Sequence, residues 1–132
     1  MQRKHFEQFI RDSIQSLPLR TREAMDNLAF VVEDEARQRK STRSTPRQSS
    51  GQAGSLLGLY EGIPKTKRGA GYSGVLPDKI TIFQKPLEAL SNGNKHKLKQ
   101  LVSEVVWHEV GHHLGFDEKE IRALEAKSKK SQ

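Results

Sequence analysis

Two histidines and a glutamate in the C-terminal part of the chain have the spacing of a hydrolytic metal site. They form the pattern His108-Glu109-x-x-His112. If this segment is helical, residues four apart lie on one face, so the two imidazoles can bind a single zinc ion. Glu109 can then take a proton from a water activated by the metal. The pattern predicts zinc-dependent hydrolysis with Glu109 as the general base.

A third ligand has to come from beyond the helix. Gly115 can adopt a left-handed conformation, end the helix and turn the chain back toward the metal. Two acids follow the glycine, Asp117 and Glu118. In the extended zincin pattern the third ligand stands three residues after the glycine, which is Glu118 in this chain. Asp117 is the alternative, and the acid that does not bind metal is expected to cap the last helix.

The helix that carries the motif is expected to bury one apolar stripe. At about 100° per residue, the apolar side chains of residues 98–106 share a face, and the three motif residues continue along it. Burying three ionisable groups costs free energy unless each has a partner, and a metal ion is such a partner. His113 points about 100° away from the second motif histidine, so packing or a hydrogen bond is expected for it. The opposite face is expected to be exposed, and it carries Lys99, Gln100, Ser103, Glu104, Trp107 and Gly111.

The other segments have an α+β order. Helical spacing marks three of them: residues 6–14, 21–25 and 86–90. Three more have strand composition or alternation: residues 28–32, 56–60 and 79–83. An extended peptide could pair with the second or third of these strands if it lies at an edge of the sheet.

The net charge of +7 is unevenly distributed. Residues 37–53 contain five basic residues and no acid, together with many Ser, Thr, Gln and Gly, which predicts a mobile loop. The tail from about residue 127 is also basic and is expected to fray. Such a loop could contact nucleic acid or an acidic partner, although a solvated linker is the plainer interpretation because no aromatic residue is interleaved with the charges.

Length and composition favour one small soluble domain. The chain has 132 residues and no cysteine, which excludes disulfides and thiolate zinc sites. Its longest apolar run, residues 28–32, is too short to cross a membrane. We therefore expect a cytoplasmic protein that does not associate with a membrane.

Three further segments, together with the zinc motif, are similar to segments of a known protein family. They are residues 26–34, 56–64 and 74–83. With the motif, they make the chain resemble the small bacterial zincin-like metallopeptidase family, once catalogued as a domain of unknown function. The resemblance covers most of residues 6–125. It implies a minimal zincin fold, in which a small mixed sheet of about three strands packs on the zinc helix.

The resemblance also implies a carboxylate as the third zinc ligand. The family often has aspartate where this chain has Glu118, and no methionine follows His112 to form the Met-turn of metzincins. The expected activity is peptide hydrolysis with one zinc ion per chain, on a peptide or protein substrate that the sequence does not identify. Tyr60 or Tyr72 could provide a second oxyanion donor.

One alternative function is a zinc-binding module that mediates protein or nucleic-acid interaction without hydrolysis. The intact Glu109 argues against this alternative, because a purely structural zinc site does not need that residue. The small size of the chain argues for it, since little protein is left to form a substrate cleft.

Overall fold

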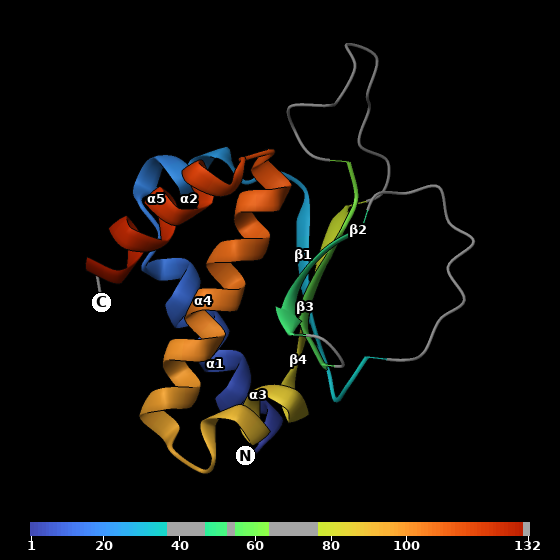
Figure 1. Cartoon of the computed structure of the whole chain (residues 1–132). Helices are drawn as coiled ribbons and strands as arrows, with labels where there is room; N and C mark the ends of the chain where they lie inside the picture. The colour runs from blue at the N-terminus through green and yellow to red at the C-terminus, as the bar shows by residue number, and fades with distance from the viewer. Residues whose placement is uncertain (37–46, 53–54, 64–76, 131–132) are drawn as a thin grey trace.

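The computed structural model describes residues 1–36, 47–52, 55–63 and 77–130. Within these ranges, five helices lie on one side of a four-stranded mixed sheet (Figure 1). This arrangement confirms the predicted α+β class, and the sheet has one strand more than the sequence suggested. No helix in the described part of the chain is long and apolar enough to cross a membrane.

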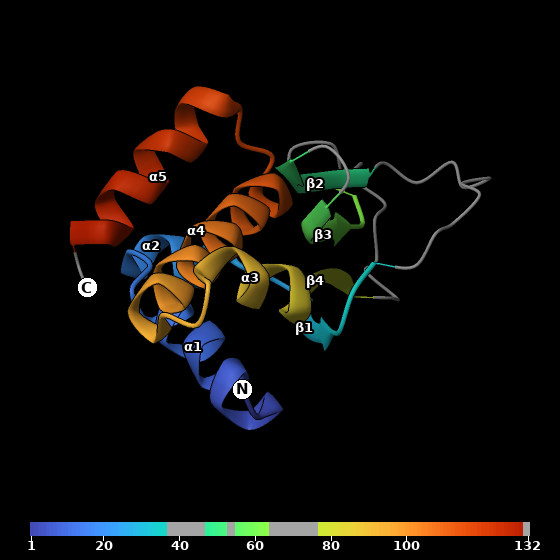
Figure 2. The same cartoon turned by 60° about the horizontal axis from the view of Figure 1, so that its bottom comes forward.

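The motif helix lies at the centre of the helical layer, between the sheet and its neighbours (Figures 1 and 2). The helices are α1 (Arg3–Gln15), α2 (Leu19–Ala24), α3 (Gln84–Ser91), α4 (Lys95–Leu114) and α5 (Glu118–Lys130). Local residues set both ends of α4. The Asn94 side chain accepts a hydrogen bond from the backbone N–H of Lys97 at 3.0 Å. Gly115 has φ 80°, so the predicted left-handed helix end is confirmed.

The sheet has the strand order β1-β4-β3-β2. Its strands are β1 (Leu28–Glu33), β2 (Arg47–Gln52), β3 (Ser55–Glu61) and β4 (Asp78–Phe83). β1 runs parallel to β4, whereas the β4–β3 and β3–β2 pairs are antiparallel. Alternation along β4 turns Ile80 and Ile82 toward α4, and the same alternation places Asp78 on that face.

Two sequence predictions about the sheet are wrong. Residues 47–52 were expected to belong to a loop but pair with β3 as strand β2. Their Arg, Gln, Ser and Gly composition gives no strand signal, so backbone pairing with a neighbour decides their conformation. β3 and β4 are the central strands, and residues 58–60 and 79–82 pair on both sides, so this part of the predicted strands offers no free edge to a substrate. The rest of the predicted loop, residues 37–46 and 53, lies outside the described residues.

The C-terminal tail is also more ordered than predicted. Helix α5 continues through Lys130, where fraying was expected from about residue 127. Ser128 in this last turn is buried. Its burial indicates that packing keeps the turn helical despite the lysines around it.

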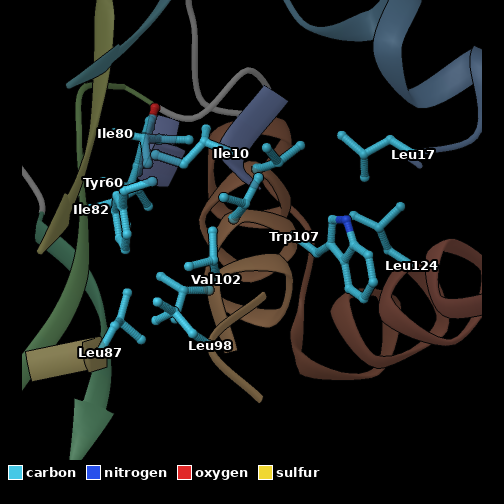
Figure 3. Close-up of a cluster of buried hydrophobic side chains, with 14 of the residues drawn as sticks. Ile10, Leu17, Tyr60, Ile80, Ile82, Leu87, Leu98, Val102, Trp107 and Leu124 are labelled. Carbon is cyan, nitrogen blue, oxygen red and sulfur yellow. The ribbon is translucent and has the colours of Figure 1, made fainter. Parts of the chain in front are cut away.

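Helix α4 is buried on nearly all sides. Figure 3 shows Ile80 and Ile82 on the sheet side of α4, and Trp107 pointing the other way toward Leu124 of α5. The Trp107 indole N–H donates to the backbone oxygen of Ser13 in α1 at 2.9 Å.

The prediction of an exposed α4 face is therefore only partly correct, since Gln100 and Glu104 are exposed but the other side of this face is covered. Ser103, Trp107 and Gly111 are all buried, and the hydroxyl oxygens of Ser103 and Ser13 lie 2.8 Å apart. The prediction assumed one buried stripe, as on a surface helix, whereas α1 and α5 cover the second face of α4.

Candidate metal centre

His108 and His112 face each other across one turn of α4. Their Nε2 atoms lie 3.0 Å apart, and the ring planes meet at 76°. Zinc–nitrogen bonds of about 2.0–2.1 Å at a tetrahedral angle separate two ligand nitrogens by about 3.3 Å. The two rings thus need to move only slightly to share a metal ion, and the residues present fit one.

The protonation state of His112 also suits a ligand. Burial lowers the pKa of His112 to about 4, and the nearby His108 acts in the same direction, while Glu118 opposes them. At neutral pH the His112 imidazole is therefore uncharged, which is the form that binds metal. The influence of Glu118 also shows that this carboxylate lies close enough to the pair to interact with it.

Glu109 lies on the core side of α4, next to the histidine pair. Its side chain is fully buried, and it follows Val102 and Val105 at helical spacing. Burying a carboxylate among apolar residues costs free energy. Ionisable groups placed at such a cost are concentrated at functional sites. The burial of Glu109 therefore agrees with a role in chemistry.

The two acids after Gly115 have different surroundings. The Asp117 carboxylate accepts a hydrogen bond from the backbone N–H of Glu120 at 2.8 Å, and the Glu120 carboxylate accepts one from the backbone N–H of Asp117 at 3.0 Å. This reciprocal capping box starts α5, so one of the two acids, Asp117, caps the helix. Glu118 stands exposed in the first turn of α5.

The structure does not place a third metal ligand beside His108 and His112 among its described residues. Among the residues that the structure describes, no group of three His, Asp or Glu side chains lies close enough to hold a metal ion. Glu118 as the third ligand therefore stays a prediction.

A second carboxylate of α5 does reach the histidine pair. Glu125 Oε1 lies 3.7 Å from His108 Nδ1, on the side of the ring away from His112. Burial raises the pKa of Glu125, and the contact with His108 opposes this shift. The sequence analysis missed this residue, although its position seven residues after Glu118, on the same face of a helix, was a signal that could have found it.

Gly111, inside the motif, lets α5 come close to α4. A Cβ atom at this position would lie 2.6 Å from Cγ1 of Ile121, so the two helices touch where Gly111 has no side chain. Both Glu118 and Glu125 depend on this contact for their position, since Ile121 stands between them on α5.

Replacing Gly111 with alanine is expected to push α5 away from α4. Overpacking of this kind costs about 1–3 kcal/mol, whereas alanine gains at most about 1 kcal/mol over glycine within a helix. We expect a net loss of about 1 kcal/mol or more in the free energy of unfolding, measured by urea denaturation. Adding Ile121→Ala removes the clashing atom, so the double variant should lose less than the sum of the single losses. Additive losses would contradict the contact.

Tyr60 and His113 belong to a buried hydrogen-bond network. The Tyr60 hydroxyl donates to Asp78 Oδ2 at 2.6 Å, and His113 Nδ1 lies 2.8 Å from the same oxygen. The backbone N–H of Asp26 donates to His113 Nε2 at 3.3 Å, so Nδ1 carries the proton and donates to Asp78. This network joins β3, β4 and α4 in the core.

Tyr60 and Tyr72 were the two candidates for a second oxyanion donor. Tyr60 is fully buried and hydrogen-bonded within the core, which is a packing position. Tyr72 lies outside the described residues. Asp78 was missed, although an acid two residues before Ile80 on an alternating strand indicates an inward-facing charge.

Comparison with known proteins agrees with this geometry. A model of the zincin-like metallopeptidase family matches residues 25–128, which is most of the chain. The chain belongs to the zincin-like metallopeptidase family. The zincin-like match contains all four strands and the histidine pair, so the predicted family and fold are confirmed. Helices α1 and α2 precede the matched range. No curated protein matches the chain.

Proposed function

We propose that this chain is a zinc-dependent peptidase acting on a peptide or protein substrate. The observation that carries the proposal is the approach of His108 and His112 Nε2 to 3.0 Å beside the buried Glu109. It occurs in a member of the zincin-like metallopeptidase family. The two histidines would hold one zinc ion per chain, with Glu118 as the third ligand.

The choice of Glu118 over Asp117 rests on their surroundings. The Asp117 carboxylate is engaged in the cap of α5, so binding a metal would cost this helix a cap worth about 1 kcal/mol. Glu118 is exposed and already acts electrostatically on His112. Turning the Glu118 side chain toward the metal would cost less free energy than losing the Asp117 cap.

The chemistry divides between the metal and Glu109. A bound zinc ion would activate water at neutral pH and polarise the carbonyl of the scissile peptide bond. Glu109 would accept the proton of the attacking water and pass it to the leaving nitrogen. The two histidines would serve as neutral ligands, in agreement with the lowered pKa of His112.

An extended substrate would pair with the edge strand β2. Of the two edge strands, β2 contacts α4, and Figure 2 shows it beside the end of α4 that leads into α5. Backbone hydrogen bonds from a free strand edge bind extended peptides with little dependence on side chains. The proposal thus moves substrate pairing from the central strands to this edge.

Purified protein is expected to contain about one zinc ion per chain after weakly bound metal is removed, measured by elemental analysis. His112→Ala removes a ligand and should abolish stoichiometric zinc. His96→Ala is the matched control, because His96 is an exposed histidine on the same helix and should not alter zinc content. A wild-type chain that neither contains zinc nor takes it up would contradict the proposal.

Two other functions stay predictions with their own tests. Zinc binding without cleavage of any peptide in a diverse mixture would favour the non-catalytic zinc module. Nucleic-acid binding through residues 37–53 would require affinity that falls steeply with salt and disappears when this segment is deleted.

A further inference from the structure

We infer that Glu125 is a positioning residue that holds the His108 ring with Nε2 toward the metal. The inference rests on the proposed zinc site and assigns to it a residue outside the zinc-binding motif. It concerns the orientation and tautomer of a ligand, so it can be tested on metal-free protein as well as on zinc affinity.

The two nitrogens of His108 have different partners. Nε2 faces Nε2 of His112 at 3.0 Å, and Nδ1 faces Oε1 of Glu125 at 3.7 Å. In a metal-binding histidine, the nitrogen that does not bind metal commonly donates its proton to a carboxylate, which fixes the tautomer and the ring orientation. Glu125 occupies that position in this structure.

The separation of 3.7 Å is longer than the about 2.9 Å of an N–H···O hydrogen bond. A small rotation of the Glu125 side chain would close it. While the carboxylate faces Nδ1, the ring separates it from the position between the two Nε2 atoms. Glu125 is thus placed to orient His108 and not to bind the same metal.

Helix α5 carries two glutamates on the face that includes Glu125. Glu118 and Glu125 are seven residues apart, which is close to two full turns, so they project from one face. Glu118 interacts with His112 and Glu125 contacts His108. The tight contact between Gly111 and Ile121 sets the distance of this face from α4.

The contact between His108 and Glu125 is also partly shielded from solvent. The side chain of His108 is 23% exposed and that of Glu125 is 31% exposed. Water screens electrostatic contacts between fully exposed groups, so such contacts contribute little. Partial burial of both groups strengthens their attraction, so the position of the Glu125 carboxylate influences which nitrogen of His108 carries the proton.

Zinc affinity gives the first readout. Glu125→Ala is expected to weaken zinc binding about 10- to 100-fold, the usual cost of losing such a partner, measured by competition with a chromophoric chelator. Glu125→Gln should lose less, because its amide oxygen can still accept from Nδ1. Glu104→Gln is the matched control, because it removes an exposed carboxylate that acts on Glu125 from one turn before His108 on α4, whereas the carboxylate that faces His108 Nδ1 is that of Glu125.

The tautomer of His108 in metal-free protein gives the second readout. Long-range ¹H–¹⁵N spectra should show the proton on Nδ1 in the wild type and in Glu104→Gln. In Glu125→Ala the population should shift toward the Nε2–H form. A purely structural role for Glu125 would change the stability of the protein without this shift.

Two results would overturn the inference. One is a Glu125→Ala variant with wild-type zinc affinity and an unchanged His108 tautomer. The other is a variant that loses zinc as completely as His112→Ala, which would make Glu125 a ligand. If the wild type itself binds no zinc, the proposed function fails, and the tautomer measurement still decides whether Glu125 orients His108.

Discussion

Glu109→Gln is expected to abolish peptide hydrolysis while zinc stays bound. Glutamine has nearly the size and shape of glutamate but cannot accept the proton of the attacking water. Loss of a general base lowers the rate by about 10²- to 10⁴-fold. The measurements are kcat/KM on a fluorogenic peptide and zinc per chain, made on the same preparation.

The matched control is Glu104→Gln, which changes the same residue type on an exposed part of α4. This variant should cleave peptide at the wild-type rate. Glutamine is neutral and nearly the size of glutamate, so Glu109→Gln should keep the fold although the position is fully buried. A Glu109→Gln variant that cleaves as fast as wild type would show that another group is the base.

Asp78→Ala is expected to lower the free energy of unfolding by about 3–5 kcal/mol. Asp78 Oδ2 receives the hydroxyl proton of Tyr60 and faces Nδ1 of His113, and all three side chains are buried. Removing the carboxylate leaves two buried donors without this acceptor. Small domains are stable by about 5–15 kcal/mol, so the variant should unfold at a much lower urea concentration.

The control for this prediction is Asp34→Ala. Asp34 forms an exposed ion pair with Arg3, and such pairs contribute at most about 1 kcal/mol. Similar losses for Asp78→Ala and Asp34→Ala would contradict the importance of the network. Gly62 provides a further check, because a Cβ atom there would lie 2.4 Å from Asp78 Oδ1 and Gly62→Ala should disturb the same carboxylate.

Local patterns were sufficient to predict the elements that carry apolar side chains. The three strands with apolar side chains were predicted within two residues of their ends, and so was the end of α4 at Gly115. β2 could not be predicted in this way, because its polar residues form a strand through pairing with β3. The full burial of α4 was missed because it depends on α1 and α5, which are far apart in the sequence.

The residues of the candidate site also differ in whether local sequence patterns could predict their positions. His108 and His112 are one turn apart, so their proximity follows from helix geometry alone. Asp117 as a helix cap follows from the residues that begin α5. Glu125 and Asp78 meet the motif helix only through the packing of α5 and the sheet, and one sequence does not specify which surfaces will touch.

The position of Trp107 gives the protein an internal optical probe. It is the only tryptophan of the chain, it directly precedes His108, and its indole packs toward Leu124 of α5 in a dry environment (Figure 3). Its fluorescence therefore reports whether α5 is docked on α4, without any label. Since α5 also carries Glu118 and Glu125, emission that shifts toward longer wavelength would signal that the helix with these carboxylates has moved away from α4 before the rest of the fold is lost.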